Sequence, residues 1–521
     1  MTNPSTLYRG GVLHCPADPS ATALLVSGGR ITWLGTDGDA PSADRVVDLD
    51  GALVTPAFVD AHVHATDTGL ALSGLELSGV RSAGQLLDAV AGFAAGLPAD
   101  AVVLGHGWDE SGWSDATLPD AAALDRAAGG RRVYLSQASI HSALVSSALL
   151  AACPEAVDAA GYDVSGWLRR DAHHVVRAAA QGSVTRSQRV AAQRVALAHA
   201  ASLGVAAVHE CGGPEISDEE DFTGLLGISG AGVPEVYGYW GELGGAARAR
   251  ELGAVGAGGD LFADGALGSR TAHVSQPYGD GDGCGHGYLT VEQVRDHLVD
   301  CAAHGLQGGF HAIGDAAIGT VLDGFAAAAT TLGVERLRAA RHRVEHAEIM
   351  SRRMIARFVE YGIVASMQPA FDRLWGGAGR MYEARLGLAR SLESNPMGAM
   401  HSVGVALAFG SDSPVTPLDP WGSVRAAAAH HNPAQRMSVR AAFAAHTRGG
   451  WRAVHLDTEG VLALGAPATF AVWSTPAGVE RGLPVLLAED PDLRGPDDPT
   501  PLPVCRRLVL RGEVIYEEGS S

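Results

Sequence analysis

Short apolar runs alternate with alanine-rich segments of helical periodicity through most of the chain. The strand-like runs are LVTPAFVDAHVH, AVVLGHGWD, RRVYLSQ, GVAAVHE, PEVYGYW, GGDLFADG, LQGGFHAIGD, RHRVEHAEI, GIVASMQP and VALAFGSDSPV. Segments such as SQRVAAQRVALAHAASLG and VEQVRDHLVDCAAHG fill most of the gaps between them. Strand–helix alternation over roughly 400 residues favours a parallel sheet, and this many units predicts a (β/α)₈ TIM-type barrel, an α/β fold.

The two ends of the chain show a different pattern, in which short strands are broken by turns. Residues 1–57 contain Gly28-Gly29 between apolar runs, which indicates a hairpin. Residues 456–521 show the same pattern of short strands and turns. Because neither end is long enough for a closed β-domain, we expect the two to form one small β-sandwich. Two unrelated β-extensions are the alternative.

The barrel is then expected to occupy residues 58–455. This region has more strand candidates than the eight that a barrel needs. Residues from about 110 to 180, which are rich in Trp, His and Arg, therefore look like an insertion over one end of the barrel.

Composition narrows the class of protein. The chain is 46% hydrophobic and 18% charged, which is typical of a globular protein. With 38 basic and 58 acidic residues its formal net charge is −20, which disfavours nucleic acids and anionic membrane surfaces as partners. A small-molecule substrate is the expected partner, and a homodimer is left open.

Cysteine usage and the amino terminus bear on location. The six cysteines are scattered without a C-x-x-C pair, which favours free thiols over disulfides or a cysteine-based zinc site. No basic region followed by an apolar run opens the chain, and no stretch of 18 or more apolar residues occurs. We therefore expect a cytoplasmic protein that does not enter the membrane.

Metal-binding residue types stand where the predicted strands end: His62, His64, His311, His346 and Asp412. The carboxyl ends of barrel strands share one face, and residues two apart on a strand point the same way. Imidazole nitrogens with one carboxylate oxygen leave an open position for water on a bound ion. Each histidine alone is more often a hydrogen-bonded core residue, but five such residues ending four strands predict a divalent-metal site.

These segments resemble a known family. TPAFVDAHVH is similar to the P-G-x-x-D-x-H-x-H signature of the amidohydrolase superfamily. LFADGALGSRTA, FHAIGDAAI, RVEHAEI, SMQP and FGSDSPV resemble its subgroup of YtcJ-like proteins and N-substituted formamide deformylase, as do GHGWDESGW and HSALVSSALL in the insertion. The resemblance covers nearly the whole chain and does not specify a substrate.

The resemblance implies that His62, His64, His311, His346 and Asp412 are metal ligands and that Asp412 also accepts a proton from the metal-bound water. It also implies that the two ends of the chain pair into one β-sandwich. The implied activity is hydrolysis of a non-peptide C–N bond, amide or N-acyl, in a small molecule. Deamination or cyclic-amide hydrolysis at the same site, or a non-catalytic metal-binding protein, are the alternatives.

One position departs from the subgroup, which usually carries a carboxylated lysine that bridges two metals. Asp260 stands there in this chain. An aspartate carboxylate stops about 4–5 Å short of a lysine carbamate, so Asp260 is expected to bridge only if its strand moves inward. Glu210 is a longer carboxylate that could compensate, although a solvated strand-end acid is the simpler interpretation. We therefore expect one ion, with two as the alternative.

The metal and the pocket wall are less specific predictions. Zinc is the expected ion, although Mn²⁺ or Fe²⁺ suits the same ligands. The candidate substrate-binding residues are Trp108, His141, Asp264, Arg270 and Gln368. Each has a structural alternative: Trp108, like Trp113, would be core of the insertion, and Arg270 would pair with Asp264 or Asp109.

Overall fold

The computed structural model describes residues 4–113, 117–139, 141–490, 493–495 and 498–519. By its internal contacts the chain divides into two compact units. The first consists of residues 1–65 and 197–521, and the second of residues 66–196. The predicted insertion of about 110–180 lies inside the second unit, which is longer than predicted at both of its ends.

An eight-stranded parallel sheet forms the centre of the first unit. Its order is β19-β18-β17-β16-β15-β14-β13-β7. The strands are β7 (Phe58–Val63), β13 (Val205–Gly212), β14 (Glu235–Trp240), β15 (Gly256–Ala257), β16 (Gln307–Ala312), β17 (Arg343–His346), β18 (Val364–Met367) and β19 (Ala406–Phe409). Beyond β19 the chain returns to β7, where the Asp412 N–H donates to the His62 carbonyl at 2.8 Å. The sheet is thus a nearly closed barrel, as the alternating pattern predicted.

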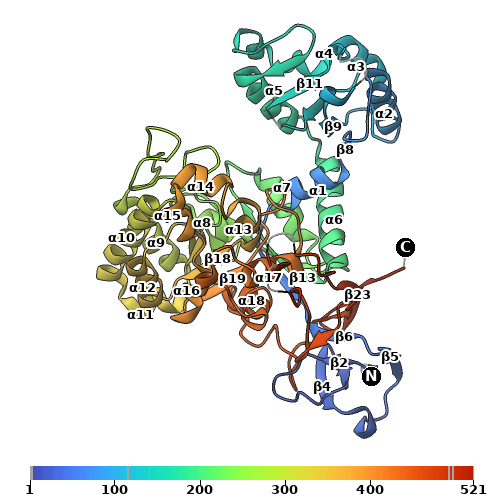
Figure 1. Cartoon of the computed structure of the whole chain (residues 1–521), viewed down its shortest axis with the longest axis vertical. Coiled ribbons are helices and arrows are strands. Elements are labelled where there is room, and N and C mark those ends of the chain that lie inside the picture. The colour runs from blue at the N-terminus through green and yellow to red at the C-terminus, as the bar shows by residue number, and fades with distance from the viewer. Residues whose placement is uncertain (1–3, 114–116, 140, 491–492, 496–497, 520–521) are drawn as a thin grey trace. The chain divides into compact units, whose positions relative to one another are not determined.

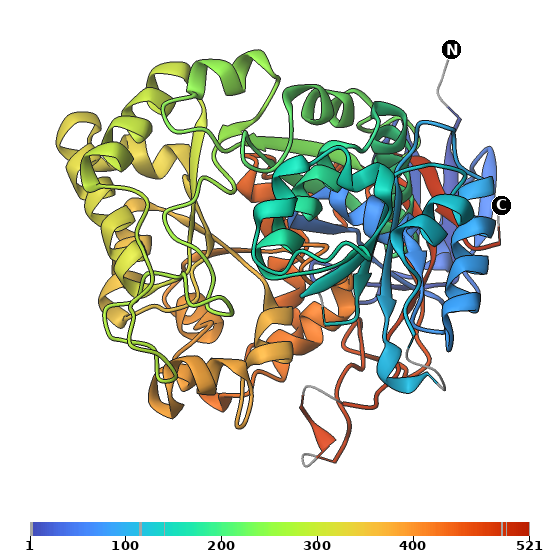
Figure 2. The same cartoon turned by 90° about the horizontal axis from the view of Figure 1, so that it is seen from above.

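Helices cover the outside of this sheet, and α9 to α12 lie together on one side of it (Figure 1 and Figure 2). The helices of the first unit that follow the barrel strands are α7 (Glu219–Gly227), α8 (Ala246–Glu251), α9 (Val291–His304), α10 (Asp315–Leu332), α11 (Val334–Ala340), α12 (Arg352–Tyr361), α13 (Pro369–Trp375), α14 (Met381–Leu386), α15 (Leu388–Leu392), α16 (Met397–Ser402), α17 (Pro420–Ala428), α18 (Val439–Ala445) and α19 (Arg448–Ala453).

Local sequence explains where these helices begin and end. The Thr290 side chain accepts from the backbone N–H of Gln293 and so caps the start of α9, and Gly305 ends that helix with φ 68°. Ser351 and Gly362 do the same for α12. Among the described residues no single helix is long and apolar enough to cross a membrane. Within those residues, α10 and α11 pass that test of length and composition as a pair, but they are bent by 116°.

Strands from the two ends of the chain share one sheet, whose order is β2-β6-β20-β23-β24. β6 (Leu53–Pro56) pairs antiparallel with β20 (Phe470–Ser474), which continues to β23 (Val504–Leu510) and β24 (Glu513–Glu517). A second sheet contains β1 (Thr6–Arg9), β3 (Ala23–Ser27), β4 (Arg30–Gly35) and β5 (Arg45–Asp48), whereas β2 (Val12–Leu13) joins the shared sheet and β21 (Val479–Glu480) pairs with β22 (Leu483–Pro484).

The two end segments also share a hydrophobic core. Tyr8 and Leu24 from one end lie in the same buried cluster as Phe470 and Val509 from the other. The pairing of the two ends is therefore present in the first unit (Figure 1). That they form a β-sandwich, and the domain limits 1–57, 58–455 and 456–521, stay predictions.

The second unit has a sheet of its own, of order β12-β11-β10-β9-β8. Its elements are α1 (Ala65–Ser73), β8 (Leu75–Glu76), α2 (Ala83–Ala95), β9 (Val103–Trp108), α3 (Ala121–Ala127), β10 (Val133–Gln137), β11 (Ser142–Val145), α4 (Ser147–Leu150), β12 (Trp167–Arg169), α5 (Arg170–Gly182) and α6 (Arg186–Ser202), of which α1 and α6 cross the limits of the unit. The runs AVVLGHGWD and RRVYLSQ, which the sequence offered as barrel strands, are β9 and β10 of this sheet.

Candidate metal centre

The five predicted ligands come together at the carboxyl ends of four barrel segments. His62 lies in β7 and His64 directly follows it, His311 lies in β16, His346 ends β17, and Asp412 follows β19. All are buried except His64, which is partly exposed. Because these segments end on the same face of the barrel, side chains far apart in sequence form one cluster.

The two histidines of β7 each donate one ring N–H to a fixed acceptor. His62 Nδ1 lies 3.0 Å from Glu345 Oε2, and His64 Nδ1 lies 3.1 Å from the Cys211 carbonyl. Neither acceptor carries a proton, so both N–H groups belong to Nδ1. The Nε2 lone pairs of both rings are thereby left available.

The histidines of β16 and β17 are oriented in the same manner. His346 Nδ1 lies 2.9 Å from Gln368 Oε1, and His311 Nε2 lies 3.2 Å from the Gly265 carbonyl. This leaves Nε2 of His346 and Nδ1 of His311 without a proton. Fixing the tautomer through the second ring nitrogen is how proteins orient histidines that bind metal.

Asp260 lies at the centre of these bare nitrogens. Its Oδ2 is 3.2 Å from His64 Nε2, and its Oδ1 is 3.5, 3.4 and 3.7 Å from His62 Nε2, His311 Nδ1 and His346 Nε2. The expectation that this carboxylate stops short of the site is wrong. The chain contains no lysine, so no carboxylated lysine can form and Asp260 occupies the position itself.

Glycines explain how Asp260 reaches the site. β15 ends at Ala257, and Gly258 and Gly259 follow with φ 156° and 78°. A Cβ on Gly258 would lie 2.3 Å from the backbone of Gly309, and one on Gly241 would lie 2.9 Å from that of Asp260. The segment therefore runs directly against neighbouring backbones, which only glycine permits, and carries the carboxylate inward.

The distances between donor atoms fit a divalent metal ion. An ion bound tetrahedrally at about 2.1 Å separates its ligands by about 3.4 Å. Asp412 Oδ1 is 3.2 Å from His64 Nε2 and 3.5 Å from His62 Nε2, and Asp260 completes this set at similar distances. Oδ1 of Asp260, which lies near His62, also lies 3.4 and 3.7 Å from His311 and His346, so the same carboxylate can be shared with a second ion.

Electrostatics agree with a site built for a cation. Burial lowers the pKa of His64, but hydrogen bonds to Asp260 and Asp412 outweigh it and raise that pKa well above its ordinary value. Burial raises the pKa of Asp260, yet the charge of His62 and hydrogen bonds from His311 and His346 hold it well below. Asp260 and Asp412 are thus ionised, and their negative charge favours a cation, either a proton or a metal ion, at the ring nitrogens that face them.

Backbone strain marks two of the same residues. Asp412 and His346 both have left-handed backbone conformations, with φ 56° and 69°. Non-glycine residues rarely adopt this region, at a cost of roughly 1–3 kcal/mol each, and they cluster at functional sites. The surrounding structure holds both side chains in orientations that relaxed strand ends would not give.

A buried ion pair supports His62 from inside the barrel. Arg343 donates to both oxygens of Glu345 at 2.8 and 2.9 Å, and both side chains are fully buried. The guanidinium also donates to His209 Nδ1 at 2.8 Å and lies over the ring of Tyr239. Burial raises the pKa of Glu345, but Arg343 outweighs it and lowers the pKa, so the acceptor for His62 stays ionised.

Replacing Arg343 with Met should destabilise the protein strongly, because Glu345 would remain buried without its partner. Breaking a buried pair in this way costs about 3–5 kcal/mol. The measurement is the free energy of unfolding by denaturant, supported by calorimetry. The matched double variant Arg343→Met/Glu345→Leu should recover much of the loss, and equal stability of the wild type and the single variant would contradict the assignment.

Neither this pair nor a further buried acid, Asp60, was predicted from the sequence. Asp60 is buried, and its carboxylate accepts from the backbone N–H groups of His62 and Ser411 at 3.2 and 2.9 Å. It thereby ties β7 to the segment that carries Asp412. The signal was present: Asp60, Arg343 and Glu345 are ionisable residues inside otherwise apolar strands, where they persist only when paired.

Two of the predicted pocket residues lie in the second unit. Trp108 is fully buried in that unit's core, and its indole N–H donates to the Leu135 carbonyl at 2.8 Å. The prediction that Trp108 lines a pocket is therefore wrong. His141 is exposed and lines, with Trp167 and Arg169 among others, a shallow pocket of about 390 Å³.

Asp264 and Arg270 have structural contacts. Asp264 is buried and accepts from the backbone N–H groups of His273, Ile313 and Gly314 at 2.8–3.0 Å, which holds two loops beside His311. Arg270 is exposed and binds Asp280 with two contacts of 3.0 Å. Its partner is therefore neither Asp264 nor Asp109, and neither side chain is free for a substrate in this geometry.

Gln368 and Glu210 support metal-binding residues. Gln368 is buried and orients His346, as described above, while its amide nitrogen has no hydrogen-bond partner among the described residues. Glu210 is buried, and its Oε2 accepts from the backbone N–H of Ala65 at 2.7 Å. It therefore fixes the chain just after His64 and does not replace the absent lysine.

A second group of metal-ligand types, Asp372, His430 and His431, lies elsewhere in the first unit. His430 Nδ1 accepts from the Asn432 N–H at 3.0 Å, so its proton is on Nε2. That N–H points to Asp372 and to the Asn395 carbonyl, at 3.2 and 3.1 Å. The group is therefore a hydrogen-bond cluster, whereas the cluster around Asp260 is the metal site that the described residues support.

The nearly closed parallel barrel has four oriented imidazoles and two carboxylates at its strand ends. These features define the class of the protein as a barrel with a metal site. Residues 45–516 match the model of the amidohydrolase family. The chain is 33% identical over 225 residues to Protein LONG AFTER FAR-RED 3 of Arabidopsis thaliana and 27% identical over 277 residues to the YtcJ protein of Bacillus subtilis. These alignments cover 41% and 50% of this chain and only 38% and 47% of those relatives.

Solved structures share the fold. A metal-dependent hydrolase of Pyrococcus furiosus superposes with a TM-score of 0.74 and 24% identity, over 90% of this chain and 98% of that one. N-isopropylammelide isopropylaminohydrolase of Burkholderia multivorans superposes with a TM-score of 0.53 and 15% identity, over 98% of both chains. Since the family model spans most of the sequence, this protein belongs to the amidohydrolase family and is YtcJ-like, which confirms the predicted resemblance.

Proposed function

We propose that this protein is a metal-dependent hydrolase that cleaves a non-peptide C–N bond, amide or N-acyl, in a small molecule. The observation that carries the proposal is the orientation of the four imidazoles. Each donates one N–H to a protein acceptor and turns its bare nitrogen toward Asp260 or Asp412. The ligands proposed are His62, His64, His311, His346, Asp260 and Asp412.

The chain's own residues have distinct tasks in this proposal. A divalent ion bound here would polarise a carbonyl and lower the pKa of water to about 7. Asp412 accepts the proton of the attacking water and delivers it to the leaving nitrogen, as general acid–base catalysis requires. Glu345 and Gln368 hold His62 and His346 in the ligating tautomer, and Gln368 still has an amide donor for a substrate carbonyl.

Zinc is the ion we propose, because imidazole and carboxylate ligands in tetrahedral geometry suit it. The expected count of one ion depended on an Asp260 that fell short of the site, and its observed position removes that argument. We now propose one ion between His62, His64, Asp260 and Asp412, with a second position open at His311 and His346.

Removing the metal should abolish activity. Neutral imidazoles and carboxylates release their ion to a strong chelator, and added divalent metal should restore turnover. The measurement is hydrolysis of a panel of amides, formamides and cyclic amides before chelation, after it, and after adding Zn²⁺, Mn²⁺ or Fe²⁺. Full activity in a preparation that elemental analysis proves metal-free would end the proposal.

The same panel separates the alternatives. Release of ammonia from an amino-substituted ring would favour deamination, and ring opening alone would favour a cyclic-amide hydrolase. Tight metal binding without turnover of any compound would favour a non-catalytic metal-binding protein. Turnover confined to phosphate esters or long peptides would contradict the proposed substrate class.

A further inference from the structure

A groove of about 720 Å³ lies at the amino-terminal ends of three barrel strands. Arg341, which precedes β17, and Ile363, which precedes β18, line it together with Ala406, the first residue of β19. Residues of α11, α12, α16, α18 and α19 form the rest of its wall. Because β17 and β19 run from this groove toward His346 and Asp412, the groove and the metal centre are at opposite ends of the same strands.

Glycines and alanines make up much of the lining of the groove. Gly362, Gly404 and Gly449 line the groove, the first two with φ 66° and 85°. Apolar side chains, among them Phe358 and Leu407, form a floor that is largely shielded from solvent. A volume of this size is within the range of about 300–1,000 Å³ that small-molecule sites occupy.

Arginines dominate the charge of the groove. Arg338, Arg341, Arg448 and Arg452 line it, against one acid, Glu335. A second acid, Asp457, lies 2.7 Å from Arg341 and 3.4 Å from Arg452. Four guanidinium groups against two carboxylates leave a local charge of +2 in a chain whose net charge is −20.

Among the described residues, Arg448 is the arginine of the groove whose side chain has no partner. Arg338 donates to the Val359 and Glu360 carbonyls at 2.6 and 3.0 Å, and Arg341 is bound by Asp457. Over the ranges that the structure describes, Arg448 has neither an ion pair nor a hydrogen bond from its side chain. Gathering like charges costs stability unless an anion compensates them.

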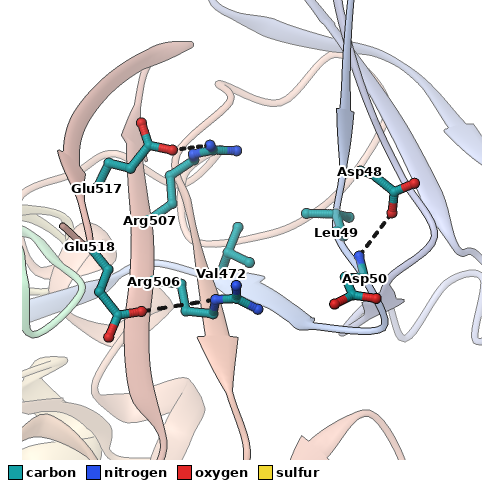
Figure 3. A pocket seen from close by; sticks show the side chains of 8 residues that line it. All are labelled: Asp48, Leu49, Asp50, Val472, Arg506, Arg507, Glu517 and Glu518. Atoms are coloured by element: carbon teal, nitrogen blue, oxygen red, sulfur yellow. Dashed lines mark hydrogen bonds and ion pairs between the residues drawn. The ribbon is translucent and has the colours of Figure 1, made fainter. Parts of the chain in front are cut away.

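Another arginine-lined pocket shows the contrast. Arg506 and Arg507 lie beside a pocket of about 140 Å³ at the shared sheet, and each faces its own acid, Glu518 or Glu517 (Figure 3). Asp48 and Asp50 also line this pocket, so its acids outnumber its arginines, and it has little room for a ligand. The basic groove at α19 has both the room and the uncompensated charge.

We propose that this groove binds a phosphate monoester with an apolar body. A phosphate monoester carries about −1.5 to −2 at pH 7, which matches the local excess of +2. The guanidinium fork is suited to bidentate contacts with phosphate oxygens. The apolar floor then receives the organic part of the ligand. This site is separate from the metal centre and does not depend on the proposed hydrolase activity.

Calorimetric titration with phenyl phosphate tests the proposal. We expect saturable binding to the wild type that weakens as salt is raised. Benzoate, which has the ring but one charge, should bind more weakly. In Arg448→Glu the affinity for phenyl phosphate should fall by roughly tenfold or more, because attraction becomes repulsion at the free guanidinium.

The control variant is Arg353→Glu, which reverses another exposed arginine outside the groove and should bind as the wild type does. Arg448 is the first residue of α19, where an acid is tolerated by the helix dipole, so Arg448→Glu should fold. Arg452→Gln provides a second, milder change that should also weaken binding. Absence of saturable binding at millimolar phenyl phosphate, or equal affinity in Arg448→Glu, would overturn the proposal, since phosphate held at the metal centre would not respond to Arg448.

Discussion

Asp260→Ala should lose at least one equivalent of bound metal per chain, and most of the hydrolase activity with it. The reason is geometric: the Asp260 carboxylate lies within 3.2–3.7 Å of four imidazole nitrogens. Glu210 is not placed to take over, since its carboxylate is engaged at Ala65, and the chain has no lysine. The measurement is metal content by elemental analysis of wild type and variant, with Co²⁺ substitution to report the ligand geometry spectroscopically.

The matched control is Asp323→Ala, which removes an exposed carboxylate paired with Arg357 and should keep the wild-type metal content. Activity of the wild type should not depend on added bicarbonate, because no lysine carbamate can form. If Asp260→Ala retains the wild-type metal content and the same Co²⁺ spectrum, Asp260 is not a ligand. A fall from two ions to one or none would establish that it is shared between two metals.

Asp412→Asn should separate metal binding from catalysis. Asn keeps an oxygen of similar reach but cannot accept a proton, so the variant should retain much of its metal. Its kcat should fall by roughly 10²–10⁴-fold, the usual contribution of general acid–base catalysis. The measurement combines metal content with kcat and KM on the best substrate of the panel.

A second variant and the steady-state constants of Asp412→Asn test the role of Asp412 further. Asp412→Ala should lose metal as well as rate, because the Oδ1 that lies 3.2 Å from His64 Nε2 disappears. A change in KM with an unaltered kcat in Asp412→Asn would remove Asp412 from proton transfer. Neither variant should alter the affinity of the basic groove for phenyl phosphate, which lies at the other end of the strands.

The histidine cluster could be predicted because it follows from strand periodicity. His62 and His64 are two apart on one strand, and the ends of parallel strands converge, so residues distant in sequence were expected to meet. Asp260 could not be placed in this way. The predicted gap of about 4–5 Å between its carboxylate and the site assumed a straight strand. In the structure β15 has only two residues, and the glycines after it let the backbone move inward.

The place of β9 and the pairing inside β17 were also not predicted, because a sequence pattern does not show which elements pack together. An apolar run such as the one that ends in Trp108 has the same pattern in a barrel and in a separate small sheet, so sequence alone could not assign β9 to the second unit. Arg343 and Glu345, which belong to the run RHRVEHAEI, were not among the residues predicted to have a role. Their period of two places Arg343 and Glu345 on the same side of β17, where burial forces them to pair.

The sheet shared by the two ends of the chain determines when folding can be completed. β6 ends at Pro56, and its partner β20 begins at Phe470, so β6 has no neighbour on that side until the late strands have been synthesised. Pairing of segments so distant in sequence makes folding slow, and the waiting strand presents an unpaired apolar edge. Chains that stop before β20 should therefore accumulate as aggregates even though the whole barrel has been made. Supplying more chaperone during synthesis should therefore raise the yield of folded protein.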